Sequence, residues 1–179
     1  MYKTSVTELL KLLDKPALLN WANQQGLKGI DIQKDRSKWL NDGTSIHSQI
    51  ENFLLKGTPF INKETQFKFV EFMANKEVLG IENKIETEWF TGRYDIKLLI
   101  ENKEYIVDWK LNHKTLYLEN KLQLIGYAMG EKCDGLAIVS VPDFTIMKFS
   151  VSNREPYEEI LKALSMIYNY KKEIENGKL

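Results

Sequence analysis

The sequence predicts an α/β protein with a helical N-terminal part. Apolar residues recur at helical spacing over the first third of the chain, and from Gly80 onward the spacing changes to the alternation typical of strands. Predicted strands and helices then follow one another to the C-terminus. The chain has 179 residues, of which 43% are hydrophobic and 28% are charged, as in one ordinary domain with a core. This composition excludes a disordered and a fibrous protein.

The first third of the chain is predicted to be helical. A helix over 6–13 begins after Ser5 or Thr4, either of which can cap it. Pro16 interrupts this pattern, because proline lacks the amide hydrogen that a helix interior needs. The further helices cover 17–25, ended by Gly26; 45–55, ended by Gly57; and a segment from Asn62 or Thr65 to Met73.

The rest of the chain is predicted to alternate between strands and helices. The predicted strands cover 81–90, 94–100, 104–109, 135–141 and 145–151, with a turn at 101–103. The predicted helices cover 118–129 and 157–174. Since no repeat, low-complexity tract or linker interrupts the chain, we expect one domain. It would consist of a helical part (1–78), a sheet with its helix (79–151) and a C-terminal helix (152–179).

Charge and cysteine content exclude several classes of protein. The 25 basic residues balance the 25 acidic ones, which argues against coating nucleic acid by bulk electrostatics but allows an enzyme with a local basic groove. The single cysteine, Cys133, excludes an intramolecular disulfide and a four-cysteine iron–sulfur cluster. No membrane span is predicted, and the N-terminal segment, with Glu8 and Asp14, does not look like a targeting sequence. We therefore expect a cytoplasmic protein.

Two aspartates stand in predicted strands that are otherwise apolar. Asp95 precedes Ile96, and Asp108 lies inside the predicted strand 104–109. Lys110 follows two residues later, so it projects from the same face as Asp108. Buried acids are costly unless they are paired or bind a metal, and carboxylate oxygens suit a hard divalent cation beside a phosphate. A solvated strand face is the alternative interpretation.

Polar residues on two predicted helices are further candidates. Gln123 and Tyr127 are four residues apart and share one helix face; the alternative is a surface glutamine and a core tyrosine. His47 lies on the helix 45–55, with Glu51 one turn later. An imidazole suits Mn²⁺ beside two carboxylates, although an ordinary surface or core histidine would give the same pattern.

Five short segments of the sequence, taken in their order along the chain, form a recognisable set of motifs. They are 5–22, 43–51 (GTSIHSQIE), 92–95 (GRYD), 108–110 (DWK) and 123–127 (QLIGY). In this order they resemble the PD-(D/E)XK nuclease superfamily and, within it, the RecB-like exonuclease branch. The segment 5–22 is similar to the start of phage-type exonucleases of that branch, which are related to mitochondrial genome-maintenance exonucleases.

The resemblance implies a restriction-endonuclease-like core, in which helices flank a central mixed β-sheet. It also implies a DNA exonuclease that hydrolyses phosphodiester bonds of single strands or DNA ends in replication, recombination or repair. A phage-encoded enzyme would act in the host cytoplasm, beside replication or recombination proteins. The alternatives are a non-catalytic nucleic-acid-binding or recombination-partner protein that keeps the fold, and a structure-specific or site-specific endonuclease. Oligomeric state is left open.

Site residues follow from the same resemblance. The metal, Mg²⁺ or Mn²⁺, would be held by His47, Asp95, Asp108 and the backbone carbonyl of Trp109. The catalytic set would be Asp95, Asp108, Lys110, Gln123 and Tyr127, with Lys110 as the catalytic lysine and the last two as positioning groups. Leu111 stands where relatives commonly place a small hydroxyl residue, so one phosphate contact is in doubt.

The N-terminal part is predicted to carry some of the charge that holds DNA. From Met1 to Lys38 there are seven basic residues (3, 11, 15, 28, 34, 36, 38) and four acidic ones (8, 14, 31, 35). Since affinity for phosphates depends on such cations, a locally basic segment in a neutral chain predicts that DNA is bound weakly and in a salt-sensitive way.

Overall fold

The computed structural model describes residues 3–13, 16–29 and 46–177. The chain divides into two compact units, which are described separately. The larger unit consists of Met1–Leu12 with Asn62–Leu179, and the smaller unit is Leu13–Ile61. Every helix within the described ranges is too short or too polar to cross a membrane.

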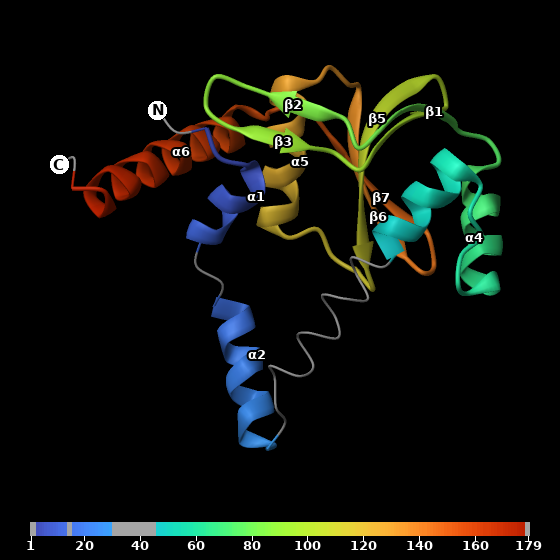
Figure 1. Cartoon of the computed structure of the whole chain (residues 1–179), viewed down its shortest axis with the longest axis horizontal. Coiled ribbons are helices and arrows are strands. Elements are labelled where there is room, and N and C mark those ends of the chain that lie inside the picture. The colour runs from blue at the N-terminus through green and yellow to red at the C-terminus, as the bar shows by residue number, and fades with distance from the viewer. Residues whose placement is uncertain (1–2, 14–15, 30–45, 178–179) are drawn as a thin grey trace. The chain divides into compact units, whose positions relative to one another are not determined.

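A five-stranded mixed sheet forms the centre of the larger unit (Figure 1). Its strands, in spatial order, are β1 (Glu77–Ile81), β4 (Ile96–Ile100), β5 (Lys103–Leu111), β6 (Gly135–Val141) and β7 (Thr145–Ser150). All neighbouring strands are antiparallel except β5 and β6, which run parallel. The prediction of an α/β fold with a central mixed sheet flanked by helices is therefore confirmed.

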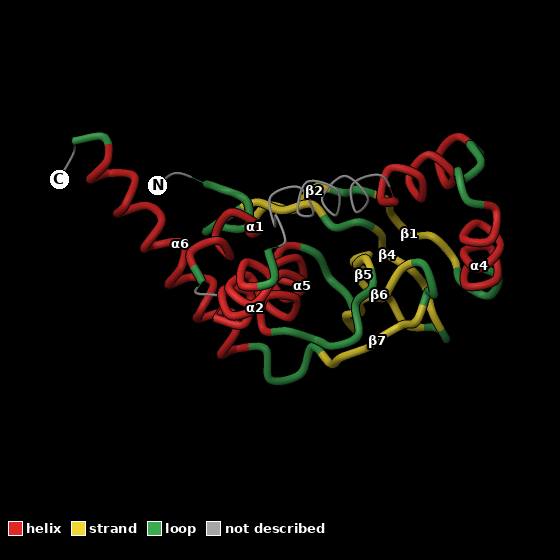
Figure 2. Tube along the Cα trace, turned by 90° about the horizontal axis from the view of Figure 1, so that it is seen from below, coloured by secondary structure: helices red, strands yellow, loops and turns green. Residues whose placement is uncertain are grey.

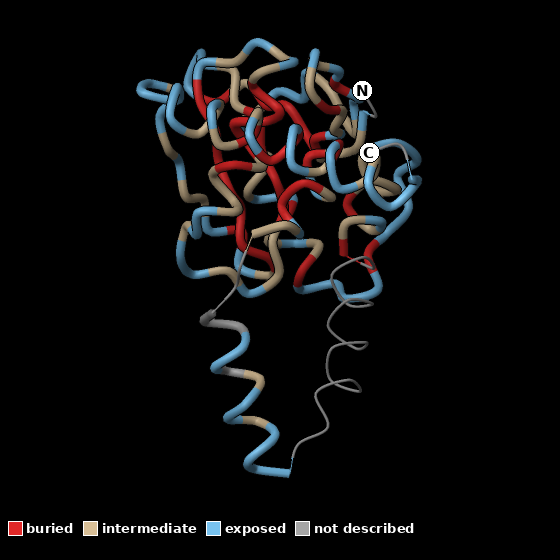
Figure 3. Tube along the Cα trace, turned by 90° about the vertical axis from the view of Figure 1, so that its left-hand side faces the viewer, coloured by how far each residue is buried: buried red, intermediate tan, exposed pale blue. Residues whose placement is uncertain are grey.

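Helices cover both faces of this sheet. In Figure 2, α5 (Leu118–Gly130) and α6 (Glu155–Glu175) lie on one side, and α4 (Lys63–Met73) lies on the other. The short helix α1 (Val6–Leu9), followed by a 3₁₀ turn at Leu10–Leu12, contacts α5 and α6. Buried segments gather in the interior of this unit (Figure 3). Because both faces are covered, the central strands β5 and β6 are rich in apolar residues.

The pleat of β5 sends alternate side chains to the two faces. Trp109 packs against α4, where its ring centroid lies 6.1 Å from that of Phe69 and 6.0 Å from that of Phe72. Successive side chains of a strand point to opposite faces, so Asp108 and Lys110 point toward α5. One strand thus supplies an aromatic core on one side and polar groups on the other.

One predicted strand, 81–90, is wrong. The chain instead ends β1 at Ile81 and then forms a separate two-stranded hairpin of β2 (Lys84–Glu86) and β3 (Thr91–Arg93). The break comes at Glu82, which adopts a positive φ of 52°, and a register shift already disturbs β1 between Val78 and Gly80. A continuous strand cannot pass through a left-handed residue, so the alternating pattern was misleading here.

Several local predictions are confirmed. Ser5 caps α1, accepting a hydrogen bond from the Glu8 amide at 3.2 Å. Asn62 caps α4, because its side chain accepts from the first amides of that helix. The predicted turn between β4 and β5 contains Glu101 and Asn102, whose φ values of 53° and 60° match a tight hairpin turn.

The smaller unit contains α2 (Pro16–Leu27) and a helix over residues 46–56. Pro16 stands at the first position of α2, where its missing amide hydrogen is harmless. In the second helix and its exit, the rings of Phe53 and Phe60 pack edge to face at 5.5 Å. The predicted start of this helix at Ser45 lies outside the described residues.

The aromatic cluster between α4 and the sheet gives a prediction about stability. Phe69 is 1% exposed and packs on Trp109, whereas Phe67 on the same helix is 70% exposed. We expect Phe69→Ala to lower the free energy of unfolding by about 3–5 kcal/mol, because it leaves a cavity in a packed core. Phe67→Ala is the matched control and should cost less than about 1 kcal/mol. Urea denaturation measures both, and equal losses would contradict the described packing.

Candidate active site

Asp108 and Asp95 come together where β4 begins beside β5. Asp108 lies inside β5 with a side chain that is 2% exposed. Asp95 stands one residue before β4, not within a strand as predicted, because the chain bends there and the Asp95 carbonyl accepts a hydrogen bond from the Glu82 amide at 2.9 Å. The Asp95 carboxylate accepts a hydrogen bond from the Trp109 amide at 2.8 Å. This bond fixes Asp95 against the residue that separates Asp108 from Lys110.

Lys110 contacts the buried carboxylate directly. Its Nζ lies 2.6 Å from Oδ2 of Asp108 and donates a hydrogen bond to Oε1 of Gln123 at 3.2 Å. The prediction that Asp108 and Lys110 share a face is therefore confirmed. Burial lowers the pKa of Lys110, but the charge and hydrogen bond of Asp108, with the charge of Asp95, outweigh it and raise that pKa. The ammonium group thus stays protonated.

Gln123 and Tyr127 continue this chain of contacts along α5. Gln123 Nε2 donates to the Tyr127 hydroxyl at 2.7 Å, as their spacing on one helix face predicted. Burial raises the pKa of Tyr127, the charges of Asp108 and Asp95 raise it further, and hydrogen bonds with Gln123 and Thr7 oppose the shift. Tyr127 therefore keeps its phenolic proton. Gln123 is a link between Lys110 and Tyr127, not merely a surface residue.

Thr7 belongs to this network, although sequence patterns gave it no role. Its side chain hydrogen-bonds Tyr127 and joins the N-terminal segment to α5. The one available signal was its place in the segment 5–22. Gly92 on β3 also lies close to Tyr127: a Cβ there would be 3.0 Å from the tyrosine ring. Glycine therefore allows β3 to pack closely on this ring.

The other two predicted metal ligands, His47 and the backbone carbonyl of Trp109, stay predictions. His47 belongs to the smaller unit, and its assignment as a ligand stays a prediction. The Trp109 side chain packs on α4 and its amide donates to Asp95, while the role of its carbonyl stays a prediction. Within residues 3–13, 16–29 and 46–177, no three His, Cys, Asp or Glu side chains gather as a metal cluster. The structure therefore brings together Asp95 and Asp108 as the acidic pair of the predicted ligand set.

The N-terminal cations are partly engaged in ion pairs. Lys3 lies 2.6 Å from Glu86, and Lys11 pairs with Glu8. Four other basic residues of that segment, at 15, 34, 36 and 38, lie outside the described residues, as do residues 43–45 of the histidine segment. The proposed role of the N-terminal charge excess in holding DNA stays a prediction.

Comparisons with known proteins add little to this description. No protein-family model matches the chain, and no curated protein sequence matches it. A solved structure described as the crystal structure of SSO0001 is similar, with 16% sequence identity and a TM-score of 0.49 over 93% of this chain and 77% of that one. The functional inference therefore depends on the side chains of the site.

The ion pair in β5 gives a prediction about coupling. We expect Lys110→Met to lower the free energy of unfolding by about 3 kcal/mol, because it leaves the Asp108 carboxylate buried without its cation. Adding Asp108→Asn should recover part of that loss, which gives a coupling energy of about 1–3 kcal/mol in a double-mutant cycle.

A surface pair serves as the control for this cycle. Lys172 and Glu175 lie 2.7 Å apart but are 42% and 45% exposed, so their coupling should stay below about 0.5 kcal/mol. Chemical denaturation of each variant gives the free energies. A coupling as weak for the β5 pair as for the α6 pair would contradict a buried, structurally important interaction.

Proposed function

We propose that this protein is a divalent-metal-dependent nuclease that hydrolyses phosphodiester bonds of DNA, acting as an exonuclease on single strands or DNA ends. One observation carries the proposal: Lys110 Nζ lies 2.6 Å from a carboxylate oxygen of buried Asp108, with Asp95 fixed beside them. A non-catalytic binding module has little reason to bury this combination. The resemblance of the sequence motifs to RecB-like exonucleases supports the same interpretation.

The donor atoms fit a hard divalent cation. Asp95 and Asp108 supply carboxylate oxygens, the ligands that Mg²⁺ and Mn²⁺ prefer. Both carboxylates act on the pKa values of Lys110 and Tyr127, so they share one electrostatic environment, in which two negative charges face one ammonium group. Asp95 and Asp108 would hold the cation, with His47 as the proposed third ligand. When bound, such a cation supplies a Lewis acid that polarises a phosphoryl oxygen and makes water a better nucleophile.

Lys110 would act on the phosphate itself. An ammonium group has three N–H donors, of which Asp108 and Gln123 take two. The third can donate to a phosphate oxygen or orient an attacking water, where it offsets the negative charge that develops in the transition state. Gln123 and Tyr127 would hold the ammonium group in place, so they are positioning residues.

The cellular setting is also a proposal. A DNA exonuclease of this kind would act in replication, recombination or repair, in the cytoplasm or in the host cytoplasm if a phage encodes it. A lone cysteine, Cys133, fits such a reducing compartment. Replication or recombination proteins are the proposed partners.

The proposal predicts that catalysis depends on Lys110. We expect the protein to degrade labelled DNA oligonucleotides with Mg²⁺ or Mn²⁺ and to stop when EDTA is added. Lys110→Ala should lower kcat by roughly 10²–10³-fold, because it removes a donor aimed at the developing charge. Product ladders from 5′- and 3′-labelled substrates, followed over time, measure the rate and the polarity.

Lys103→Ala is the matched control, since Lys103 is an exposed lysine at the start of the same strand. Its activity should stay within about twofold of wild type, as for most surface substitutions. Intact DNA after incubation of the wild-type protein with Mn²⁺, or equal activity of the two lysine variants, would refute the proposal. Cleavage of circular single strands would instead identify an endonuclease.

The ligand set gives a separate prediction about metal affinity. In calorimetric titrations with Mn²⁺, Asp108→Asn should abolish binding, because it removes a charged oxygen ligand. His47→Ala should weaken binding by about tenfold or more. His113→Ala is the control: this second histidine bonds Asn120 at 2.8 Å, and its removal should leave the affinity unchanged. An unchanged affinity in His47→Ala would exclude that imidazole from the ligand set.

A further inference from the structure

A cleft of about 690 Å³ adjoins the candidate active site in the larger unit. Its walls come from the N-terminal segment and the β2–β3 hairpin: Ser5, Thr7, Lys84, Ile85, Glu86, Thr91, Gly92 and Arg93. The volume is within the range of sites that bind small molecules or one unit of a polymer. Hydroxyl groups and basic side chains make up most of the polar lining, which is the chemistry that binds phosphate.

The two basic residues that line this cleft, Lys84 and Arg93, lie opposite each other in the hairpin. Lys84 and Arg93 are directly opposite residues of β2 and β3, a position at which like charges destabilise a strand pair. Arg93 Nε is partly compensated by Glu82 at 2.7 Å, whereas Lys84 forms no ion pair with any residue that the structure describes. An anion bound between the two cations would remove this repulsion.

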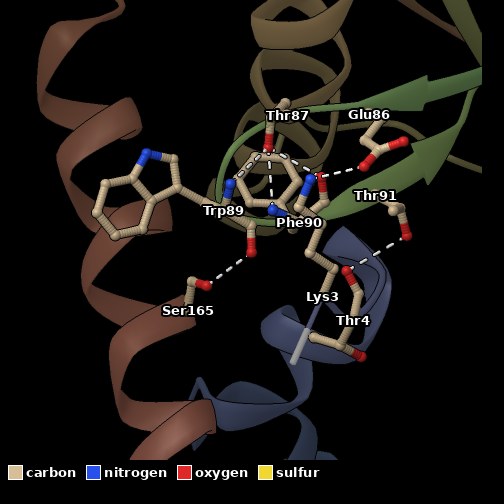
Figure 4. A network of polar contacts seen from close by, with 8 residues as sticks. All are labelled: Lys3, Thr4, Glu86, Thr87, Trp89, Phe90, Thr91 and Ser165. Atoms are coloured by element: carbon tan, nitrogen blue, oxygen red, sulfur yellow. Dashed lines mark hydrogen bonds and ion pairs between the residues drawn. The ribbon is translucent and has the colours of Figure 1, made fainter. Parts of the chain in front are cut away.

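The hairpin that carries these cations is anchored at its turn (Figure 4). Thr87 accepts hydrogen bonds from the backbone of the turn, and the Ser165 hydroxyl of α6 donates to the Trp89 carbonyl at 2.8 Å. On the N-terminal segment, the Thr4 carbonyl accepts from the Thr91 amide at 2.9 Å. The hairpin is thus fixed at one end, and Lys84 and Arg93 stand at the other.

That other end leads directly into the candidate active site. Arg93 is two residues before Asp95, and the Tyr94 amide donates to the Asn83 carbonyl at 3.3 Å where the hairpin closes. Thr7 both lines the cleft and hydrogen-bonds Tyr127. A polymer whose reacting group lies at Lys110 therefore has this cleft as an adjacent surface.

We propose that the cleft binds the phosphodiester backbone of the DNA strand next to the bond that is cleaved, an inference that rests on the proposed nuclease function. Lys84 and Arg93 would contact one or two phosphates. The Ser5 hydroxyl, which accepts from the Glu8 amide, keeps its own O–H as a donor for a phosphate oxygen. Substrate binding would then relieve the repulsion between Lys84 and Arg93, which Glu82 offsets only at Arg93.

The test measures binding without hydrolysis. A fluorescent single-stranded DNA oligonucleotide is titrated with each variant in EDTA at several NaCl concentrations, and thermal melts establish that every variant is folded. Lys84→Ala/Arg93→Ala should weaken binding roughly tenfold or more and reduce the slope of log K against log salt by about 0.7 for each lost phosphate contact. Lys84→Ala alone, which breaks no ion pair with described residues, should lose part of this affinity.

Lys103→Ala/Lys171→Ala removes the same charge at exposed positions outside the cleft and should bind within about twofold of wild type. Equal binding by the cleft and control variants would overturn the proposal. So would displacement of the oligonucleotide by inorganic phosphate at matched ionic strength, which would identify a site for a free anion.

If the wild-type protein cleaves no DNA with Mn²⁺ but the cleft variants still lose affinity, the proposed nuclease function is refuted and DNA binding in the cleft is supported. Normal cleavage together with unchanged binding in the cleft variants would leave the nuclease function standing and overturn the role of the cleft.

Discussion

The contact between Lys110 and Asp108 inside the central strand is the interaction around which the larger unit is organised. A buried carboxylate is costly unless a cation and hydrogen bonds compensate it, and Lys110 at 2.6 Å provides that compensation. The strand pleat then determines the rest of the core. Trp109, between the two charged residues, must point the other way, and α4 covers it with aromatic rings. Position 109 therefore packs the core, while positions 108 and 110 build the site.

The same contact determines which helices approach the sheet on the polar side. Gln123 reaches Lys110 from α5, and Tyr127, one turn further along, bonds to Gln123 and Thr7. Close approach of the N-terminal segment requires a small residue on α5, because a Cβ at Gly126 would lie 2.8 Å from a methyl group of Val6. A polar chain from β5 through α5 to α1 thus arises from one helix face and one glycine.

Sequence patterns predicted the elements whose signals are local and strong. The alternation of apolar residues located β6 at 135–141, and the spacing of Gln123 and Tyr127 indicated that they would meet. The failures came where tertiary contacts decide. The strand 81–90 breaks at left-handed Glu82, and the hairpin beyond it depends on hydrogen bonds to α6 and the N-terminal segment. Thr7 could not be assigned a role, because its partner is 120 residues away along the chain.

The neutral charge of the chain becomes informative once its cations are located. Of the N-terminal cations, Lys3 and Lys11 are already paired with glutamates, whereas Lys84 and Arg93 are set against each other near the acidic pair. In the proposed nuclease, phosphate affinity would come from a few cations placed beside the reacting bond, not from a basic surface. Few phosphate contacts give weak binding with a shallow dependence on salt. An exonuclease benefits from such weak binding, because every contact to the strand must break before the next phosphate can reach Lys110.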